Sequence, residues 1–226
     1  MGLFKKDEDL NVIRPKNIGW LEKKLSSEEI DYVWNCIKNQ RKASMKDKLA
    51  GNIHASHQLI DKDDWFFQKT LYPLCLRYAK EFGNRGDGIP IITTHPYFLE
   101  KWWVNYQKQN EFNPLHSHTG VYSFVIWMKI PTSHFRQNLN PIALSANSRC
   151  ISNFEFKYLN ILGGIEDYSY ELSKNDEGTL VFFPSSLMHN VHPFYNCDKE
   201  RISVSGNILL QTTDMSVNQR TDLSYF

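Results

Sequence analysis

The stretch NPLHSHTGVYSFVIW, residues 113–127, indicates the fold class. It joins two histidines, His116 and His118, to an apolar run rich in β-branched and aromatic residues, which favour β-strands. Similar runs recur along the second half of the chain and are separated by turn residues such as Gly163-Gly164. The pattern predicts six strands, at Tyr97 to Gln107, Val121 to Ile130, Asn153 to Leu162, Tyr168 to Leu172, Thr179 to Phe183 and Arg201 to Leu210.

The first hundred residues have a helical pattern instead. Ser26 and Glu29 form a predicted capping box. The apolar residues that follow them recur at helical spacing. A second helix is expected to begin after Asp63 or Asp64 and to end at Gly83. The expected buried faces comprise Ile30, Val33, Trp34 and Ile37 in the first helix and Phe67, Leu71, Leu74, Cys75, Tyr78 and Phe82 in the second.

Many short strands after a helical lead-in predict an α+β fold, a double-stranded β-helix (jelly roll) buttressed by N-terminal helices. We expect a single domain over residues 1–226. Within it, residues 1–90 form the helical support, residues 91–212 form the jelly-roll core, and residues 213–226 form a C-terminal tail. The segments 42–60 and 132–149 have no clear pattern, and we expect them to form a lid.

The bulk composition excludes several classes of protein. The 226 residues carry a formal net charge of +1, which gives no electrostatic reason to expect nucleic acid or an anionic membrane as a partner. There is no apolar run of signal-peptide or membrane-spanning length, so we expect a soluble, cytoplasmic protein. The four cysteines are widely scattered, and buried reduced thiols are favoured over two disulfides.

Three histidines have the spacing of metal ligands. In an extended chain, residues i and i+2 share a face with Cα atoms about 6.6 Å apart, so His116 and His118 can bind one ion. The third ligand is expected to be His189, in GTLVFFPSSLMHNV (178–191), because the chain must turn shortly before it. His192 competes for this role, three positions further on. The other four histidines, interpreted as surface or packing residues, are His54, His57, His95 and His134.

The stretch RISVSGNILL, residues 201–210, places its polar side chains on one face. Arg201, Ser203, Ser205 and Asn207 alternate with apolar residues, a pattern that a half-buried surface strand would also show. If Arg201 lies inside a barrel, its guanidinium group needs a carboxylate partner, because an unpaired buried charge is costly. The strand contains no acidic residue, and a bound carboxylate ligand would satisfy the arginine.

These residues resemble the 2-oxoglutarate- and Fe(II)-dependent oxygenases, specifically the prolyl-hydroxylase-like branch, and are more similar still to oxygenases encoded by marine tailed phages. The resemblance covers roughly residues 100–210. It implies that His116, His118 and His189 bind the metal and that Arg201, assisted by Ser203, binds 2-oxoglutarate. In the family a tyrosine ten residues before the first histidine also contacts this co-substrate, and that position is Tyr106 here.

One position departs from the family pattern. The usual second ligand is the acid of His-x-Asp, whereas position 118 is a histidine. We interpret His118 as a ligand on strand geometry. Alternatively, Glu111 supplies the carboxylate and His118 only assists, and a site without the acid can also be inactive.

The resemblance implies an enzyme that uses Fe(II), 2-oxoglutarate and O2 to hydroxylate a substrate while 2-oxoglutarate becomes succinate. The substrate, a small molecule or a peptide, and the oligomeric state are not predicted, and a phage origin would place the protein in the host cytoplasm. Two rivals remain: a cupin-like metalloenzyme that does not use 2-oxoglutarate, and a non-catalytic jelly-roll binding protein. The aromatic residues expected around the pocket, or in the core, are Trp102, Trp103, Phe124, Trp127 and Phe183.

Overall fold

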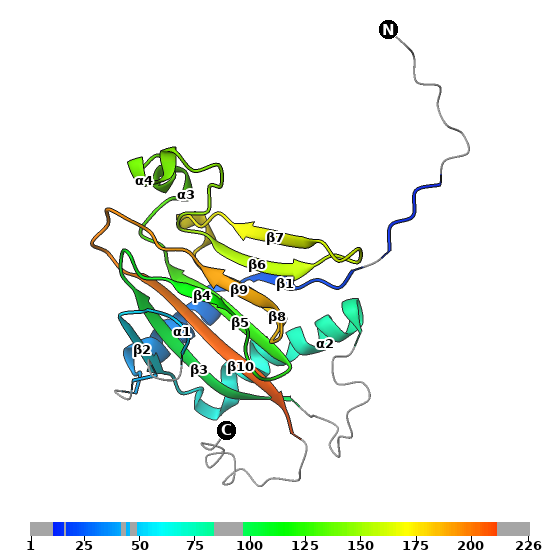
Figure 1. The fold of residues 1–226 in the computed structure, drawn as a ribbon. Helices are drawn as coiled ribbons and strands as arrows, with labels where there is room; N and C mark the ends of the chain where they lie inside the picture. Colours follow the sequence, from blue (N-terminus) through cyan, green and yellow to red (C-terminus); the bar gives the residue numbers. More distant parts are fainter. Residues whose placement is uncertain (1–10, 16, 42–43, 46–48, 84–96, 212–226) are drawn as a thin grey trace.

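The computed structural model describes residues 11–15, 17–41, 44–45, 49–83 and 97–211. Within them the chain is mixed α/β with two antiparallel sheets that face each other (Figure 1). The six-stranded sheet has the order β1 (Leu21–Lys24), β8 (Thr179–Pro184), β5 (Tyr122–Lys129), β10 (Arg201–Leu210), β3 (Tyr97–Gln107) and β2 (Ala55–Gln58). The four-stranded sheet has the order β4 (Asn113–His116), β9 (Met188–Val191), β6 (Phe154–Leu159) and β7 (Ile165–Tyr170).

Helices α1 (Ser27–Lys38) and α2 (Tyr72–Phe82) cover the outer face of the six-stranded sheet (Figure 1). The ring of Tyr78 lies 5.0 Å from that of Tyr122 and 6.3 Å from that of Phe182, which places one helix directly on the sheet. A second apolar cluster fills the space between the two sheets. The helical segments are α1 (Ser27–Lys38), the 3-10 turn Lys62–Asp64, the π-helical turn Phe67–Leu71, α2 (Tyr72–Phe82), α3 (His134–Gln137), α4 (Pro141–Leu144) and the 3-10 turn Lys174–Asp176.

Strand alternation sorts the side chains of β10 and β3 between these two clusters. Val204 pairs with Val104, and both lie in the cluster beneath the helices. The next pair, Ser205 with Trp103, points to the opposite face, toward the four-stranded sheet. Register therefore decides which residues can reach the space between the sheets.

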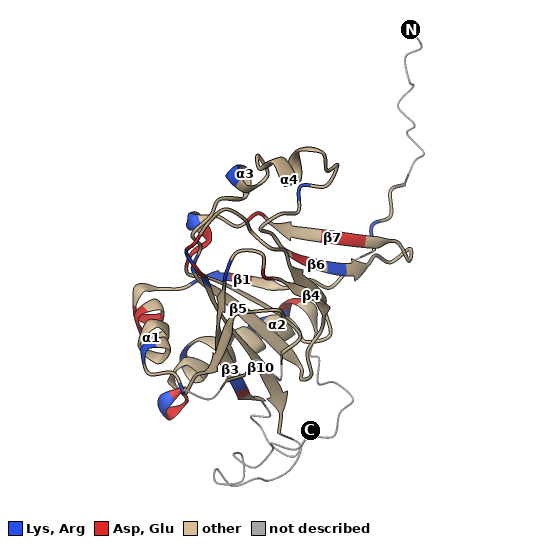
Figure 2. Cartoon of the chain, turned by 60° about the vertical axis from the view of Figure 1, so that its left-hand side comes forward, with Lys and Arg blue, Asp and Glu red and all other residues tan. Residues whose placement is uncertain are grey.

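Charged side chains lie mostly outside the sheets. Figure 2 shows both signs of charge on α1 and on the β6–β7 hairpin, whereas most of the ribbon of β5 and β10 carries none. None of the helices in the described parts of the chain is long and apolar enough to cross a membrane. The four cysteines form no disulfide; Cys36 and Cys75 are buried, whereas Cys150 and Cys197 are partly exposed, although buried thiols were expected for all four.

The strand predictions agree closely with the structure at 97–107 and 201–210 and to within a few residues elsewhere. The first hundred residues are less helical than expected, because β1 and β2 extend the six-stranded sheet at its two edges. The sequence also gave no indication of β4 and β9 as separate strands. All four of these strands are only four residues long, too short for an alternating pattern to be recognised. The predicted tail, residues 213–226, lies outside the described residues.

The capping box of α1 gives a test of the helical layer. The hydroxyl of Ser26 accepts from the backbone N–H of Glu29, and the carboxylate of Glu29 accepts from the backbone N–H of Ser26. We expect Ser26→Ala to lower the free energy of unfolding by about 1 kcal/mol. Ser27→Ala, at the exposed neighbouring position, is the matched control and should change it by less than about 0.5 kcal/mol. Equal losses in urea denaturation would show that the cap contributes nothing.

Candidate metal centre

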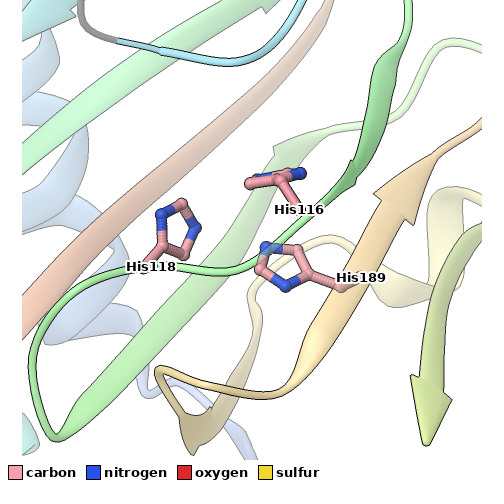
Figure 3. Close-up of side chains that lie close together, drawn as sticks. All are labelled: His116, His118 and His189. Carbon is pink, nitrogen blue, oxygen red and sulfur yellow. The ribbon is translucent and has the colours of Figure 1, made fainter.

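Three imidazole rings meet in the space between the sheets. His116 ends β4, His118 follows two residues later, and His189 lies on β9 directly opposite His116 in the β4–β9 register. The ring centroids are 4.3 to 5.0 Å apart, and one nitrogen from each ring lies within 4.8 Å of the others. Figure 3 shows the three side chains pointing toward one another from these two segments. The arrangement has the composition of a three-histidine metal site.

Backbone carbonyl groups set the orientation of two of the rings. Nδ1 of His116 lies 2.7 Å from the carbonyl oxygen of Pro114, and Nδ1 of His189 lies 2.9 Å from that of Leu187. A carbonyl can only accept, so Nδ1 carries the proton in both rings and Nε2 keeps its lone pair. Metal-binding histidines are commonly oriented in this way. His118 is placed by its backbone N–H, which donates to Ser185 at 2.8 Å.

Burial keeps two of the imidazoles uncharged. It lowers the pKa of His118 to about 4, with a further contribution from neighbouring His116. Burial, followed by the proximity of His116 and His118, lowers the pKa of His189 to about 3. Both rings are therefore neutral at pH 7, the state in which a histidine can bind a metal ion.

The histidines line a cavity of about 200 Å³ between the sheets. Arg201 lines the same cavity, and among the described lining residues it is the only one with a permanent charge. Ser203 and Ser205 follow it on β10, in register with Asn105 and Trp103 on β3. The remaining lining residues are Leu49, Ala50, Gly51, Ile53, Asn113, Ser117, Phe124, Val125, Trp127, Phe154, Phe183 and Val191.

Arg201 is a buried cation with neutral partners. Its side chain is 2% exposed, and burial lowers its pKa to about 10, so it remains charged at neutral pH. Nη2 donates to the carbonyl oxygen of Ser152 at 2.9 Å, and Nη1 donates to Oε1 of Gln107 at 3.4 Å. Among the described residues no carboxylate pairs with it, and its Nε has no hydrogen-bond partner.

Tyr106 does not join this site, which corrects the sequence prediction. It pairs with Ile202 in the β3–β10 register and packs with the cluster beneath the helices, on the face opposite Arg201. Its hydroxyl donates to Gln40 at 3.1 Å. The ten-residue spacing to His116 matched the family pattern, but neighbouring strand residues point to opposite faces. Asn105 lines the cavity instead.

His192 and Glu111, the two alternative metal ligands considered from the sequence, both make contacts outside the histidine cluster. Nε2 of His192 lies 2.9 Å from the carboxylate of Glu155, outside the histidine cluster. The carboxylate of Glu111 accepts from the backbone N–H groups of His54 and Lys108, each at 2.8 Å. Glu111 therefore does not supply a carboxylate to the cluster, which consists of histidines alone among the described residues.

The aromatic residues that were expected around the pocket are confirmed in part. Trp103, Phe124, Trp127 and Phe183 line the cavity, whereas Trp102 packs beneath the helices. Leu49, Ala50, Gly51 and Ile53 line the cavity, and a lid formed by the 42–60 segment stays a prediction. These four residues are held there by a β-bridge between Asn52 and Phe112. The 132–149 connection forms α3 and α4 and contributes none of the described lining residues.

Two predicted packing histidines are placed as expected. His134 is buried, and its Nδ1 lies 2.6 Å from Asn153. The ring of His57 packs against Tyr106 at 6.2 Å. His95 lies outside the described residues. Sequence reasoning missed Ser152 and Gln107, which contact Arg201, because neither belongs to a motif.

Comparison with known proteins supports the class of the site. Residues 101–207, a little under half of the chain, match the family model described as "Putative 2OG-Fe(II) oxygenase". This range contains the three histidines and Arg201. The match confirms the predicted enzyme class, an oxygenase, and its cofactors, iron, 2-oxoglutarate and dioxygen. No curated protein matches the chain, and the closeness to phage oxygenases remains a prediction.

Solved structures show the same fold at low sequence identity. An oxidoreductase of the 2OG-Fe(II) oxygenase family from Burkholderia pseudomallei is 11% identical, with a TM-score of 0.51 over 82% of this chain and 81% of that one. The non-heme alpha ketoglutarate dependent carbocyclase SnoK from nogalamycin biosynthesis is 9% identical, with a TM-score of 0.50 over 86% and 80%. A Pseudomonas putida prolyl-4-hydroxylase is 15% identical, with a TM-score of 0.49 over 87% of this chain and 94% of that one.

His189 and His192, the two candidates for the third metal ligand, give a matched pair of variants that tests the histidine cluster. His189→Ala removes one of three converging imidazoles, and we expect the affinity for Fe(II) to fall by more than about 100-fold. Disturbing only a hydrogen-bond partner of a ligand costs roughly 10- to 100-fold.

His192→Ala, three residues away, should bind Fe(II) as the unchanged protein does. Anaerobic equilibrium dialysis measures both. Stoichiometric binding by the His189 variant would rule the cluster out as the metal centre.

Proposed function

We propose that this protein is a 2-oxoglutarate-dependent Fe(II) dioxygenase that hydroxylates its substrate while 2-oxoglutarate is decarboxylated to succinate. His116, His118 and His189 hold the metal, and Arg201, assisted by Ser203, binds the distal carboxylate of 2-oxoglutarate. The facing sheets form a double-stranded β-helix, since the chain alternates between them from β3 to β10 except at the β6–β7 hairpin. A peptide remains one candidate substrate.

The observation that carries this proposal is the charge of Arg201. A charged guanidinium that is fully buried without a carboxylate partner lowers the stability of the fold. A bound anion would offset this cost by pairing with the charge. Arg201 lines the same cavity as the histidine cluster. A ligand that chelates a metal at one end and presents a carboxylate at the other satisfies both features.

The residues present fit an iron ion. Imidazole nitrogens bind Fe(II), and three ligands from β9 and the end of β4 with the residues after it leave other positions open for co-substrate and dioxygen. When bound, iron supplies the redox chemistry by which dioxygen oxidises both 2-oxoglutarate and a substrate C–H bond. The set differs from the usual two histidines and one carboxylate, so the site keeps one more positive charge.

The protein's own residues bind, orient and exclude water. Arg201 and Ser203 fix the far end of the co-substrate, since β10 places both side chains on the cavity face. Trp103, Trp127 and Phe183 line the cavity with apolar surface, which keeps the local dielectric low and strengthens the attraction between guanidinium and carboxylate.

One observation favours a second candidate function. The cluster contains no carboxylate among the described residues, and three-histidine sites also occur in cupin-like metalloenzymes that use no 2-oxoglutarate. Such an enzyme would need no charged partner for Arg201. Binding of 2-oxoglutarate to the metal-loaded protein therefore separates the two functions.

Replacement of Arg201 tests the co-substrate assignment. We expect Arg201→Ala to bind Fe(II) normally and to lose turnover of 2-oxoglutarate, because a bidentate, charge-assisted pair is lost. Anaerobic titration with Fe(II) and then 2-oxoglutarate, followed by visible absorption and calorimetry, should show at least about 100-fold weaker co-substrate binding.

Arg149→Ala, at an exposed arginine outside the cavity, is the control and should behave like the unchanged protein. Because Arg201 is buried, the alanine variant could lose turnover simply by unfolding. Arg201→Lys keeps the charge but not the two-pronged geometry, and it serves as a second variant in case the alanine variant does not fold. Full turnover in the alanine variant would end the co-substrate assignment.

A second pair of variants tests the position where this site departs from the family pattern. We expect His118→Ala to lower Fe(II) affinity by more than about 100-fold, as for the other ligands. Glu111→Gln should leave it unchanged, since the Glu111 carboxylate is occupied by two backbone N–H groups. The opposite result, loss of metal only in the glutamine variant, would assign the carboxylate as ligand. Metal stoichiometry after gel filtration distinguishes these outcomes.

A further inference from the structure

A fully buried serine contacts Arg201 from outside the histidine and β10 motifs. Ser152 lies in the turn that precedes β6 and is 0% exposed. Its carbonyl oxygen accepts a hydrogen bond from Nη2 of Arg201 at 2.9 Å, and its hydroxyl oxygen accepts from the same nitrogen at 2.5 Å. One residue therefore holds one end of the guanidinium group with two acceptors.

The backbone of Ser152 adopts an unusual conformation to do this. Its φ angle is 72°, in the left-handed region that serine seldom occupies. The conformation is held by its N–H, which donates to the carbonyl of Pro193 at 2.9 Å, and by a 3.2 Å contact between its hydroxyl and that of Thr132. Conformations of this kind persist only where the surroundings impose them, and they cluster at functional sites.

The remaining contacts of Arg201 orient its guanidinium group without cancelling its charge. The guanidinium carbon lies 5.1 Å from the centre of the Phe194 ring, and Gln107 accepts one hydrogen bond from Nη1. These partners are neutral, as is Ser152. Fixing an arginine side chain costs conformational entropy. Because these contacts already fix the guanidinium of Arg201 in the free protein, that cost is not incurred when an anion binds.

We propose that Ser152 is a positioning residue, which holds the Arg201 guanidinium group ready for the carboxylate of the co-substrate. This inference rests on the proposed function. A neutral acceptor at this position is essential to the role: it fixes the guanidinium but leaves its positive charge for the ligand. A carboxylate at the same position would fix the guanidinium equally well and would compete with the co-substrate.

Substitution by aspartate and by asparagine separates charge from shape. The two side chains have nearly the same size, and both tolerate the left-handed region. We expect Ser152→Asp to weaken binding of 2-oxoglutarate by at least about 100-fold. Ser152→Asn should stay within about fivefold of the unchanged protein, since its amide oxygen replaces the hydroxyl as a neutral acceptor.

The measurement is anaerobic calorimetry with 2-oxoglutarate and the full-length, Fe(II)-loaded protein. Fe(II) affinity, determined separately, should be the same in both variants, and saturating 2-oxoglutarate should restore kcat for succinate formation while its KM remains high. A merely structural role would instead lower metal binding and kcat together. Ser152→Gly, which keeps φ and the carbonyl acceptor but removes the hydroxyl, should weaken co-substrate binding by about tenfold.

The possible failures are distinguishable. If the unchanged protein with Fe(II) does not bind 2-oxoglutarate, the proposed function fails. If it does bind but the aspartate and asparagine variants behave alike, charge at position 152 is irrelevant and the role assigned to Ser152 is wrong. If the larger side chains do not fit, as judged by thermal melting, unchanged affinity in Ser152→Gly overturns the role.

Discussion

The antiparallel pairing of β4 with β9 is the constraint on which the candidate site depends. It places His116 opposite His189, although 73 positions separate them in the numbering of the chain. Directly opposed residues on neighbouring strands have Cβ atoms about 5 Å apart, which is close enough for both imidazoles to reach one ion. Each histidine also has its Nδ1 close to the carbonyl two residues before it, so the local backbone orients both rings in the same way.

The cavity combines neutral imidazoles with one buried cation. Two of the imidazoles are held neutral by burial, and the guanidinium of Arg201 remains charged at a depth where water contributes little. Neutral acceptors around the arginine satisfy part of its hydrogen-bonding capacity while leaving the charge uncompensated. Under the proposed function, the neutral imidazoles bind a metal cation and Arg201 binds an anion, so a ligand that bridges the two is favoured over either alone.

The sequence predicted the long strands and the pair His116 and His118 because their signals are local, whereas it left His189 and His192 in competition for the third position. Alternation over ten residues located β3 and β10, and the two-residue spacing located His116 and His118. The error at Tyr106 has a different origin. Its ten-residue spacing to His116 matched the family pattern, but the alternation of side chains along β3 places Val104 and Tyr106 on one face and Asn105 on the other. Ser152 could not be found from sequence, since its role comes from a turn conformation and a contact 49 residues away.

The short edge strands β1 and β2 determine how much of the chain a stable fragment must contain. β1 pairs with β8, and β2 pairs with β3, so residues before position 60 complete both sides of the larger sheet. A fragment limited to the segment that matches the family model would leave rows of peptide N–H and C=O groups open on β8 and β3. Open edges of this kind recruit other chains and lead to aggregation. The N-terminal residues therefore pair with the edges of β8 and β3 that such a fragment would leave open.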